Sequence, residues 1–199
     1  MSTPVSDTAM IRAIRELFDR EAARLPPLDA PIRVVIAGGA AAHYWTGQRV
    51  SRDIDAEFAL QGTGKKSYVP LEDVIIYQDE QGQEQSIYID RNYSPSLSLM
   101  HEDYVDRIEL VPSRLGGGDK FQVFVLAPVD LAISKIARYA DVDRIDIESM
   151  YDAIDPDEFE HLATEALNTA IGLNPEQVRH NLHDAVARIR ALRGDTPGP

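Results

Sequence analysis

The sequence contains no cysteine, which excludes disulfide bonds, thiolate catalysis and thiolate metal sites. No apolar run approaches the roughly 20 residues that a membrane-spanning helix needs. Residues 1–17 are polar and helix-like, and they lack the apolar core of a signal peptide. We therefore expect a cytoplasmic protein that does not enter a membrane.

Basic residues are also few, with 20 lysines and arginines against 33 aspartates and glutamates, and the formal net charge is −13. Such a surface repels a nucleic-acid backbone, so any RNA contact needs a local basic patch. A basic partner protein is easier to accommodate. The candidates for a basic patch are Arg33, Arg49, Arg52, Lys65, Lys66 and Arg91.

The order of the predicted elements divides the chain into two parts. Residues 1–127 alternate between strands and helices, as in an α/β (α+β) core with an N-terminal helix, and residues 128–199 are helical. Pro128 and Pro175 suit the first turns of helices, and Asn174 suits a helix N-cap. Helices are predicted at 6–25, 40–45, 128–140, 143–153, 156–170 and 175–193, and strands at 33–37, 54–60, 74–77, 86–90, 106–111 and 121–126.

The most informative feature is a pair of glycines followed by a pair of carboxylates. Gly38 and Gly39 end a predicted strand where a helix begins, and backbone N–H groups at such a turn bind anions. Asp53 and Asp55 lie two apart on the next strand, so their side chains share one face. Each motif alone also has a purely structural explanation: the glycines can serve a turn, and the alternating aspartates can belong to an edge strand. Together they predict Mg²⁺ held between the protein and a triphosphate, and therefore nucleotidyl transfer.

In this order the two motifs resemble the signature of the DNA polymerase β-like nucleotidyltransferase superfamily. A second block, residues 126–138 followed by residues 143–147, resembles minimal bacterial nucleotidyltransferase-like proteins, including the AbiEii-type toxins of toxin–antitoxin systems. Residues 88–93 and 101–104 resemble an uncharacterised branch of that group. The resemblance covers residues 30–150, and it implies a mixed sheet with flanking helices and a C-terminal helical part.

The resemblance also implies roles for single residues. Asp53 and Asp55 match the metal-binding pair, and the glycine pair matches the phosphate-binding turn. Lys135 matches a lysine on the helix after the sheet, where a cation can offset phosphate charge. Asp143 and Asp146 match acidic positions after that helix, which can orient the acceptor or the lysine. For a third carboxylate we prefer Asp90, at the end of a strand, and keep Glu109 as the alternative.

Several of these residues have simpler explanations. Lys135 can be a solvated lysine that pairs with Asp130 or Asp141. Asp143 and Asp146 lie three apart on one helix face and can be surface residues, with Asp143 as an N-cap. Arg52, like Arg49, can contact phosphates or balance the two aspartates.

Other polar groupings carry less weight. Residues 116–118 are three glycines that we interpret as a hairpin tip rather than a phosphate loop. His180 and His183 lie three apart on a helix, but no further metal ligand is placed near them. Residues 101–103 read His-Glu-Asp, and adjacent side chains on one element do not converge.

The expected activity is transfer of a nucleoside monophosphate from an NTP to an acceptor hydroxyl on RNA or protein, with Mg²⁺ or Mn²⁺ as the metal. The protein would act as the toxin of a toxin–antitoxin system, with an antitoxin protein as partner. One alternative is a non-catalytic protein that binds a partner or a nucleotide. Another is an enzyme that modifies a small molecule such as an antibiotic.

Overall fold

The computed structural model describes residues 7–60, 74–90, 92–110 and 115–195. These residues form two compact units. The sheet unit contains the described residues up to Ser94 together with Ile108–Leu126, and the helical unit contains Pro95–Arg107 and the described residues from Ala127 onward. The domain division after residue 127 stays a prediction.

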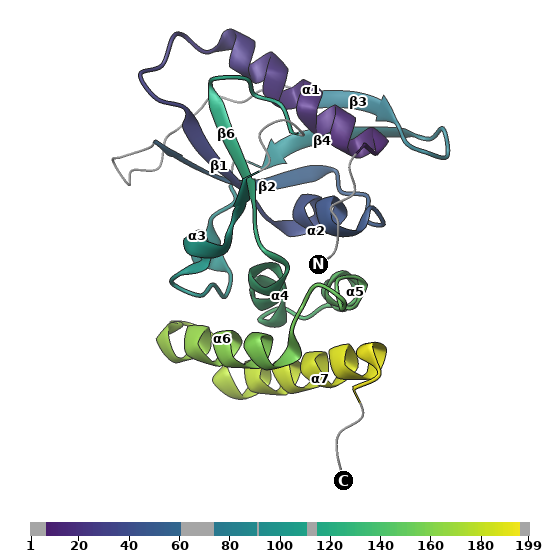
Figure 1. Ribbon diagram of the computed structural model, residues 1–199, viewed down its shortest axis with the longest axis vertical. Coiled ribbons are helices and arrows are strands. Elements are labelled where there is room, and N and C mark those ends of the chain that lie inside the picture. The colour runs from purple at the N-terminus through teal and green to yellow at the C-terminus, as the bar shows by residue number, and fades with distance from the viewer. Residues whose placement is uncertain (1–6, 61–73, 91, 111–114, 196–199) are drawn as a thin grey trace. The chain divides into compact units, whose positions relative to one another are not determined.

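The sheet unit is built on a mixed sheet in the order β3-β4-β2-β1-β6-β5 (Figure 1). Strand β1 runs antiparallel to β2 and parallel to β6, and β2 runs parallel to β4. The outer pairs, β3 with β4 and β5 with β6, are antiparallel. The strands are β1 (Ile32–Ile36), β2 (Asp53–Leu60), β3 (Val74–Gln78), β4 (Glu84–Asp90), β5 (Glu109–Leu110) and β6 (Phe121–Val125).

The two faces of this sheet differ because side chains alternate along each strand. On the core face, Val34, Ile54, Ile87 and Val123 are fully buried. Helix α1 (Ala9–Arg24) packs on this face, where Phe18 meets Phe121 edge to face with ring centroids 5.6 Å apart. We call the opposite face, which carries Asp53, Asp55 and Asp90, the open face.

Helix α2 (Gly38–Thr46) follows β1 directly and is almost entirely buried. Its alanines allow close packing, and Trp45 donates its indole N–H to the carbonyl of Leu126 at 2.9 Å. The helix ends at Gly47, whose φ of 69° suits a left-handed C-cap. The C-terminal end of α2 is thereby held beside the end of β6.

The helical unit packs α4 against α5, α6 and α7, with α6 and α7 side by side (Figure 1). Pro128 and Pro175 occupy first turns, and the side chain of Asn174 caps α7, as predicted. No helix among the described residues is long and apolar enough to cross a membrane. The elements are η1 (Pro95–Leu97), α3 (Tyr104–Arg107), α4 (Pro128–Ile136), α5 (Asp141–Ser149), α6 (Pro156–Thr169) and α7 (Pro175–Arg193).

Two local predictions are wrong. The strand expected at 106–111 is a helical turn up to Arg107, and within the described residues 106–110 the pairing with β6 is limited to Glu109 and Leu110. Arg107 makes a two-pronged ion pair with the buried Asp130, at 2.9 and 2.7 Å, which favours the turn over an extended strand. The N-cap of α5 is Ala140 rather than Asp143.

Candidate functional site

The glycine turn and the carboxylate strand are in direct contact. The N–H of Ala37 donates to the carbonyl of Asp55 at 2.8 Å. Gly38 has a φ of 59°, and a Cβ added to it would lie 2.7 Å from Cγ of Asp55 and closer still to Oδ2. Only glycine fits here, because any side chain would displace the carboxylate. The two motifs therefore form one site in the sheet unit.

Three carboxylates share the open face beside this turn. Asp53 and Asp55 alternate along β2, and Asp90 on β4 is the direct register partner of Asp55. Neighbouring strands lie about 4.8 Å apart, so these positions are adjacent. Glu109 lies on β5, with β1 and β6 between it and β2. This separation favours Asp90 as the third carboxylate of the site.

Local hydrogen bonds orient two of the carboxylates. Ser51 donates its hydroxyl to Oδ1 of Asp53 at 2.9 Å, and the N–H of Asn92 donates to Oδ1 of Asp90 at 2.8 Å. Within the described residues, no three histidine, aspartate or glutamate side chains gather into a group that could hold a metal ion. Mg²⁺ is usually bound by one or two carboxylates together with substrate phosphates, and this donor set suits that mode.

Sequence reasoning missed His43, which holds the segment beside the glycines. Its Nε2 lies 2.6 Å from the hydroxyl of Thr8, and its Nδ1 bonds to the carbonyl of Arg49. A carbonyl only accepts, so Nδ1 carries a proton, and in the neutral ring Nε2 accepts from the hydroxyl of Thr8. Burial lowers the pKa of His43, which agrees with that state. The sequence feature that could have indicated this role is the single histidine on the short alanine-rich helix after the glycines.

The segment that His43 holds closes over Gly39. A Cβ added to Gly39 would lie 2.7 Å from Nε of Arg49 and from the hydroxyl of Ser51. Arg52, next along the chain, is exposed, and its carbonyl accepts the N–H of Tyr88 at 3.1 Å. Lys65, Lys66 and Arg91, which the sequence also suggested for a basic patch, lie outside the described residues.

Lys135 belongs to the helical unit, where it is 6% exposed and lies between two carboxylates. Its Nζ donates to Asp146 at 2.7 Å and lies 3.7 Å from Asp143. The alternative of a solvated lysine paired with Asp130 or Asp141 is therefore wrong. Those two carboxylates pair instead with Arg107 and Arg144.

Asp143 has further donors besides Lys135. Arg138 donates to it twice, at 2.7 Å each, and the N–H of Ala140 donates at 3.0 Å. Burial by itself would raise the pKa of Asp143, but these bonds and the charge of Lys135 hold it below its ordinary value. The buried cluster of Lys135, Asp143 and Asp146 thus ties the start of α5 to α4. The proposed role of Lys135 at a nucleotide stays a prediction.

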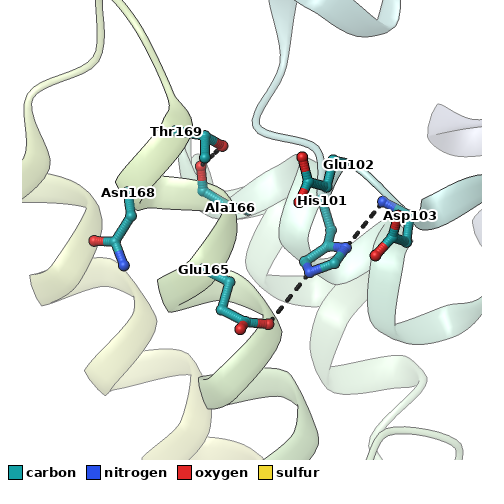
Figure 2. A pocket seen from close by; sticks show the side chains of 7 residues that line it. All are labelled: His101, Glu102, Asp103, Glu165, Ala166, Asn168 and Thr169. Carbon is teal, nitrogen blue, oxygen red and sulfur yellow. Dashed lines mark hydrogen bonds and ion pairs between the residues drawn. The ribbon is translucent and has the colours of Figure 1, made fainter.

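The His101-Glu102-Asp103 group lines a cavity of about 300 Å³ within the helical unit. Figure 2 shows the ring of His101 between Glu165 and the backbone of Asp103. Nδ1 accepts the N–H of Asp103 at 3.1 Å, and Nε2 lies 3.3 Å from Oε2 of Glu165. His101 joins the loop to α6, and the cavity that results is acidic.

A second cavity of the helical unit, of about 500 Å³, surrounds Tyr139. Tyr139 has a φ of 48°, which is strained for a bulky residue, and its hydroxyl donates to Asp184 at 2.9 Å. The cavity is rich in arginine, but Arg138, Arg144 and Arg188 all form ion pairs with carboxylates. These charges offset one another, so the cavity is a poor anion site.

The three-glycine segment is a packing feature. The N–H of Gly117 donates to Asp19 of α1 at 2.7 Å, and a Cβ added to Gly116 would lie 2.5 Å from the carbonyl oxygen of Arg15. These glycines let the segment approach the helix closely. The contacts agree with the interpretation of a hairpin connection.

A mixed sheet with a glycine turn closed against paired carboxylates defines a nucleotidyltransferase-like α/β protein. Residues 14–191 match the family described as a nucleotidyltransferase of unknown function (DUF6036), and the chain belongs to this family. It is also similar to an antigenic nucleotidyltransferase-like protein from Paracoccidioides brasiliensis, with 16% identity over 97% of this chain and 92% of that chain and a TM-score of 0.48. No curated protein matches the chain.

The contact between Gly38 and Asp55 gives a direct test. Gly118 has nearly the same φ, 56° against 59°, but a Cβ there would meet nothing within 4 Å. Gly118→Ala should therefore lower the free energy of unfolding by about 1–2 kcal/mol, which is the strain of a non-glycine residue in the left-handed conformation. Gly38→Ala should cost clearly more, because the carboxylate must also move. Denaturant unfolding of both variants measures the difference, and equal losses would show that the Asp55 contact adds no constraint.

Proposed function

We propose that the protein transfers a nucleoside monophosphate from an NTP to an acceptor hydroxyl and releases pyrophosphate. The observation that carries the proposal is the contact between Gly38 and Asp55, because it joins an anion-binding turn to the carboxylate strand. Neither motif alone would support this chemistry.

On the phosphate side, the start of α2 supplies backbone donors. Its N-cap, Ala37, has no side-chain acceptor to cap the first turn. The N–H groups at Gly38 and Gly39 would donate to the β- and γ-phosphates, favoured by the helix dipole. Arg52, exposed at the start of the carboxylate strand, would add a positive charge near the phosphates.

On the metal side, Asp53, Asp55 and Asp90 would hold Mg²⁺ or Mn²⁺. All three supply hard oxygen ligands, which suit these ions better than Zn²⁺. Bound there, the metal would stabilise negative charge on the attacking and leaving oxygens. The chain itself fixes the carboxylates by the pairing of β2 with β4 and by the hydroxyl of Ser51.

In the transfer, the hydroxyl oxygen of the acceptor bonds to the α-phosphorus. The bond from that phosphorus to the oxygen bridging to the β-phosphate breaks, and pyrophosphate leaves with the electron pair. The hydroxyl proton passes to a carboxylate of the site and then to water. The residues of the site mainly position the groups and balance charge, which is what phosphoryl transfer demands.

We also propose, from the resemblance of the block around Lys135, that the protein acts in the cytoplasm as the toxin of a toxin–antitoxin pair. Its antitoxin would then be the protein partner. An enzyme that modifies a small molecule such as an antibiotic is compatible with the same chemistry, and the identity of the acceptor separates the two.

A non-catalytic role is the second candidate, because no three acidic or histidine side chains of the described chain converge into a metal-binding group. The two candidates differ in metal dependence. Carboxylates without a cation repel a triphosphate, so an enzyme should show a thermal shift with NTP and Mg²⁺ that EDTA removes. Release of pyrophosphate on adding acceptor would follow. The absence of a shift with any NTP in either condition would favour the partner-binding candidate.

A further inference from the structure

The β3–β4 part of the open face is exposed and apolar, which is unusual beside a carboxylate site. Val74, Ile76 and Tyr88 are 52%, 67% and 43% exposed. Val74 is the register partner of Tyr88, and Tyr88 is the register partner of Asp53. The three side chains therefore continue the open face outward from the carboxylates. We call them the apolar platform.

The position of the platform follows from the order of the strands. Strand β2, which carries Asp53 and Asp55, has β1 on one side and β4 on the other. The glycine turn lies on the β1 side, where Gly38 contacts Asp55. The platform and Asp90 lie on the β4 side.

This arrangement assigns the two sides different tasks, provided that the proposed transfer is correct. In-line displacement requires the attacking hydroxyl and the leaving pyrophosphate on opposite sides of the α-phosphorus. If the β- and γ-phosphates bind at Gly38 and Gly39, pyrophosphate leaves toward β1. The acceptor must then approach from the β4 side, over the platform.

The charge around the platform identifies the class of acceptor. Residues 74–90 contain no lysine or arginine. Of their four carboxylates, Asp79 is buried in the β3–β4 turn and Glu80 bonds to the start of α1, so Glu84 and Asp90 are the two that flank the platform on the open face. An RNA backbone needs cations to replace its counterions, and this hairpin supplies none. Exposed aliphatic and tyrosine side chains with an acidic rim fit apolar side chains flanked by basic ones.

We propose that the acceptor is a protein segment in which a hydroxyl-bearing residue is flanked by apolar and basic side chains, and that it docks on Val74, Ile76 and Tyr88. The proposal rests on the transfer activity proposed above and names its acceptor. The hydroxyl oxygen of that segment forms the new bond to the α-phosphorus, and pyrophosphate leaves toward the glycine turn.

The test pairs two substitutions on one face of the sheet. Ile76 on β3 and Leu110 on β5 are both exposed, 67% and 46%, and both face the open side, but they lie at opposite ends of the strand order. Ile76→Glu should weaken acceptor binding about tenfold or more, in the range of an interface hot spot. Leu110→Glu should leave it unchanged, although it adds the same charge.

The first probes are short synthetic peptides in which one serine, threonine or tyrosine lies between leucines, with lysines on both flanks. The second probes are the same peptides with glutamates in place of the lysines, and the third probe is total RNA. Peptide binding is followed by fluorescence anisotropy, and label transfer is followed with each α-labelled NTP and Mg²⁺. We expect binding and labelling of the basic peptides, loss of both in Ile76→Glu, and an unchanged NTP-induced thermal shift in both variants.

The outcomes separate the acceptor proposal from the activity that it depends on. Labelling of RNA in preference to every basic peptide would overturn the protein acceptor. The protein acceptor would also be overturned by equal binding of basic and acidic peptides, by no binding of either, or by equal effects of Ile76→Glu and Leu110→Glu. In each of these cases the proposed transferase activity would stand if the NTP-induced thermal shift remains. If the wild-type chain shows no NTP-induced shift, the transferase fails and the acceptor proposal falls with it.

Discussion

Asp55→Asn is expected to reduce transfer of label from an α-labelled NTP by about 10²-fold or more, the usual cost of one preorganised electrostatic group. Asparagine keeps the shape that packs against Gly38, so the glycine turn stays in place. The change removes only the negative charge that would hold the metal. Asp53→Asn should have a similar effect, because its side chain shares the open face. Pyrophosphate release and label transfer measure both variants.

The matched control is Glu109→Gln, which removes one negative charge from the same sheet. Its strand, β5, is separated from β2 by β6 and β1. This control should keep full activity, whereas Asp90→Asn should lose it if Asp90 is the third carboxylate. In the proposed toxin role, Asp55→Asn should also relieve growth arrest caused by expression. Full label transfer in both Asp53→Asn and Asp55→Asn would contradict the catalytic proposal.

The sequence was most informative where the site depends on short-range pattern. The period of two along a strand predicted that Asp53 and Asp55 share a face, and a strand ending in two glycines predicted the turn. The contact between Gly38 and Asp55 needed the antiparallel pairing of β1 with β2, which sets Ile36 opposite Ala56. Alternating apolar residues in both strands made that pairing plausible but did not fix its register.

Long-range contacts were beyond the sequence. One alternative for Lys135 was a solvated side chain that pairs with Asp130 or Asp141, the acidic residues nearest to it in the sequence. The actual partner, Asp146, lies on the next helix, beyond the turn at Tyr139 with its φ of 48°. A periodic pattern does not encode the direction in which a chain leaves such a turn, so the burial of Lys135 could not be predicted.

His43 and Arg107 illustrate the same limit. His43 bonds to Thr8, which is 35 residues away, and Arg107 pairs with Asp130, which is 23 residues away. The contact with Thr8 fixes the His43 ring that bonds to the carbonyl of Arg49, and the two-pronged pair with Asp130 favours the turn at residues 104–107. Local propensity favoured a strand at 106–111, and the ion pair with a buried carboxylate outweighs it.

Lys135→Met is expected to destabilise the helical unit by about 3–5 kcal/mol, the cost of breaking a buried ion pair by removing one partner. Methionine fills much of the same space, but it removes the cation that lies 2.7 Å from Asp146 and 3.7 Å from Asp143. The loss should appear in the far-ultraviolet circular dichroism of the helices. Fluorescence of Trp45, the single tryptophan of the chain and part of the sheet unit, reports separately on the other unit.

The double variant Lys135→Met with Asp146→Leu separates a structural lysine from one that binds a nucleotide. Replacing both members of a buried pair by apolar side chains is often neutral, so stability should return, while Asp143 keeps its two bonds from Arg138. If Lys135 only holds the helices together, the NTP-induced thermal shift returns as well. If the lysine contacts the triphosphate, as the resemblance implies, stability recovers but nucleotide binding does not. A single variant as stable as wild type would show that the buried pair contributes little to the fold.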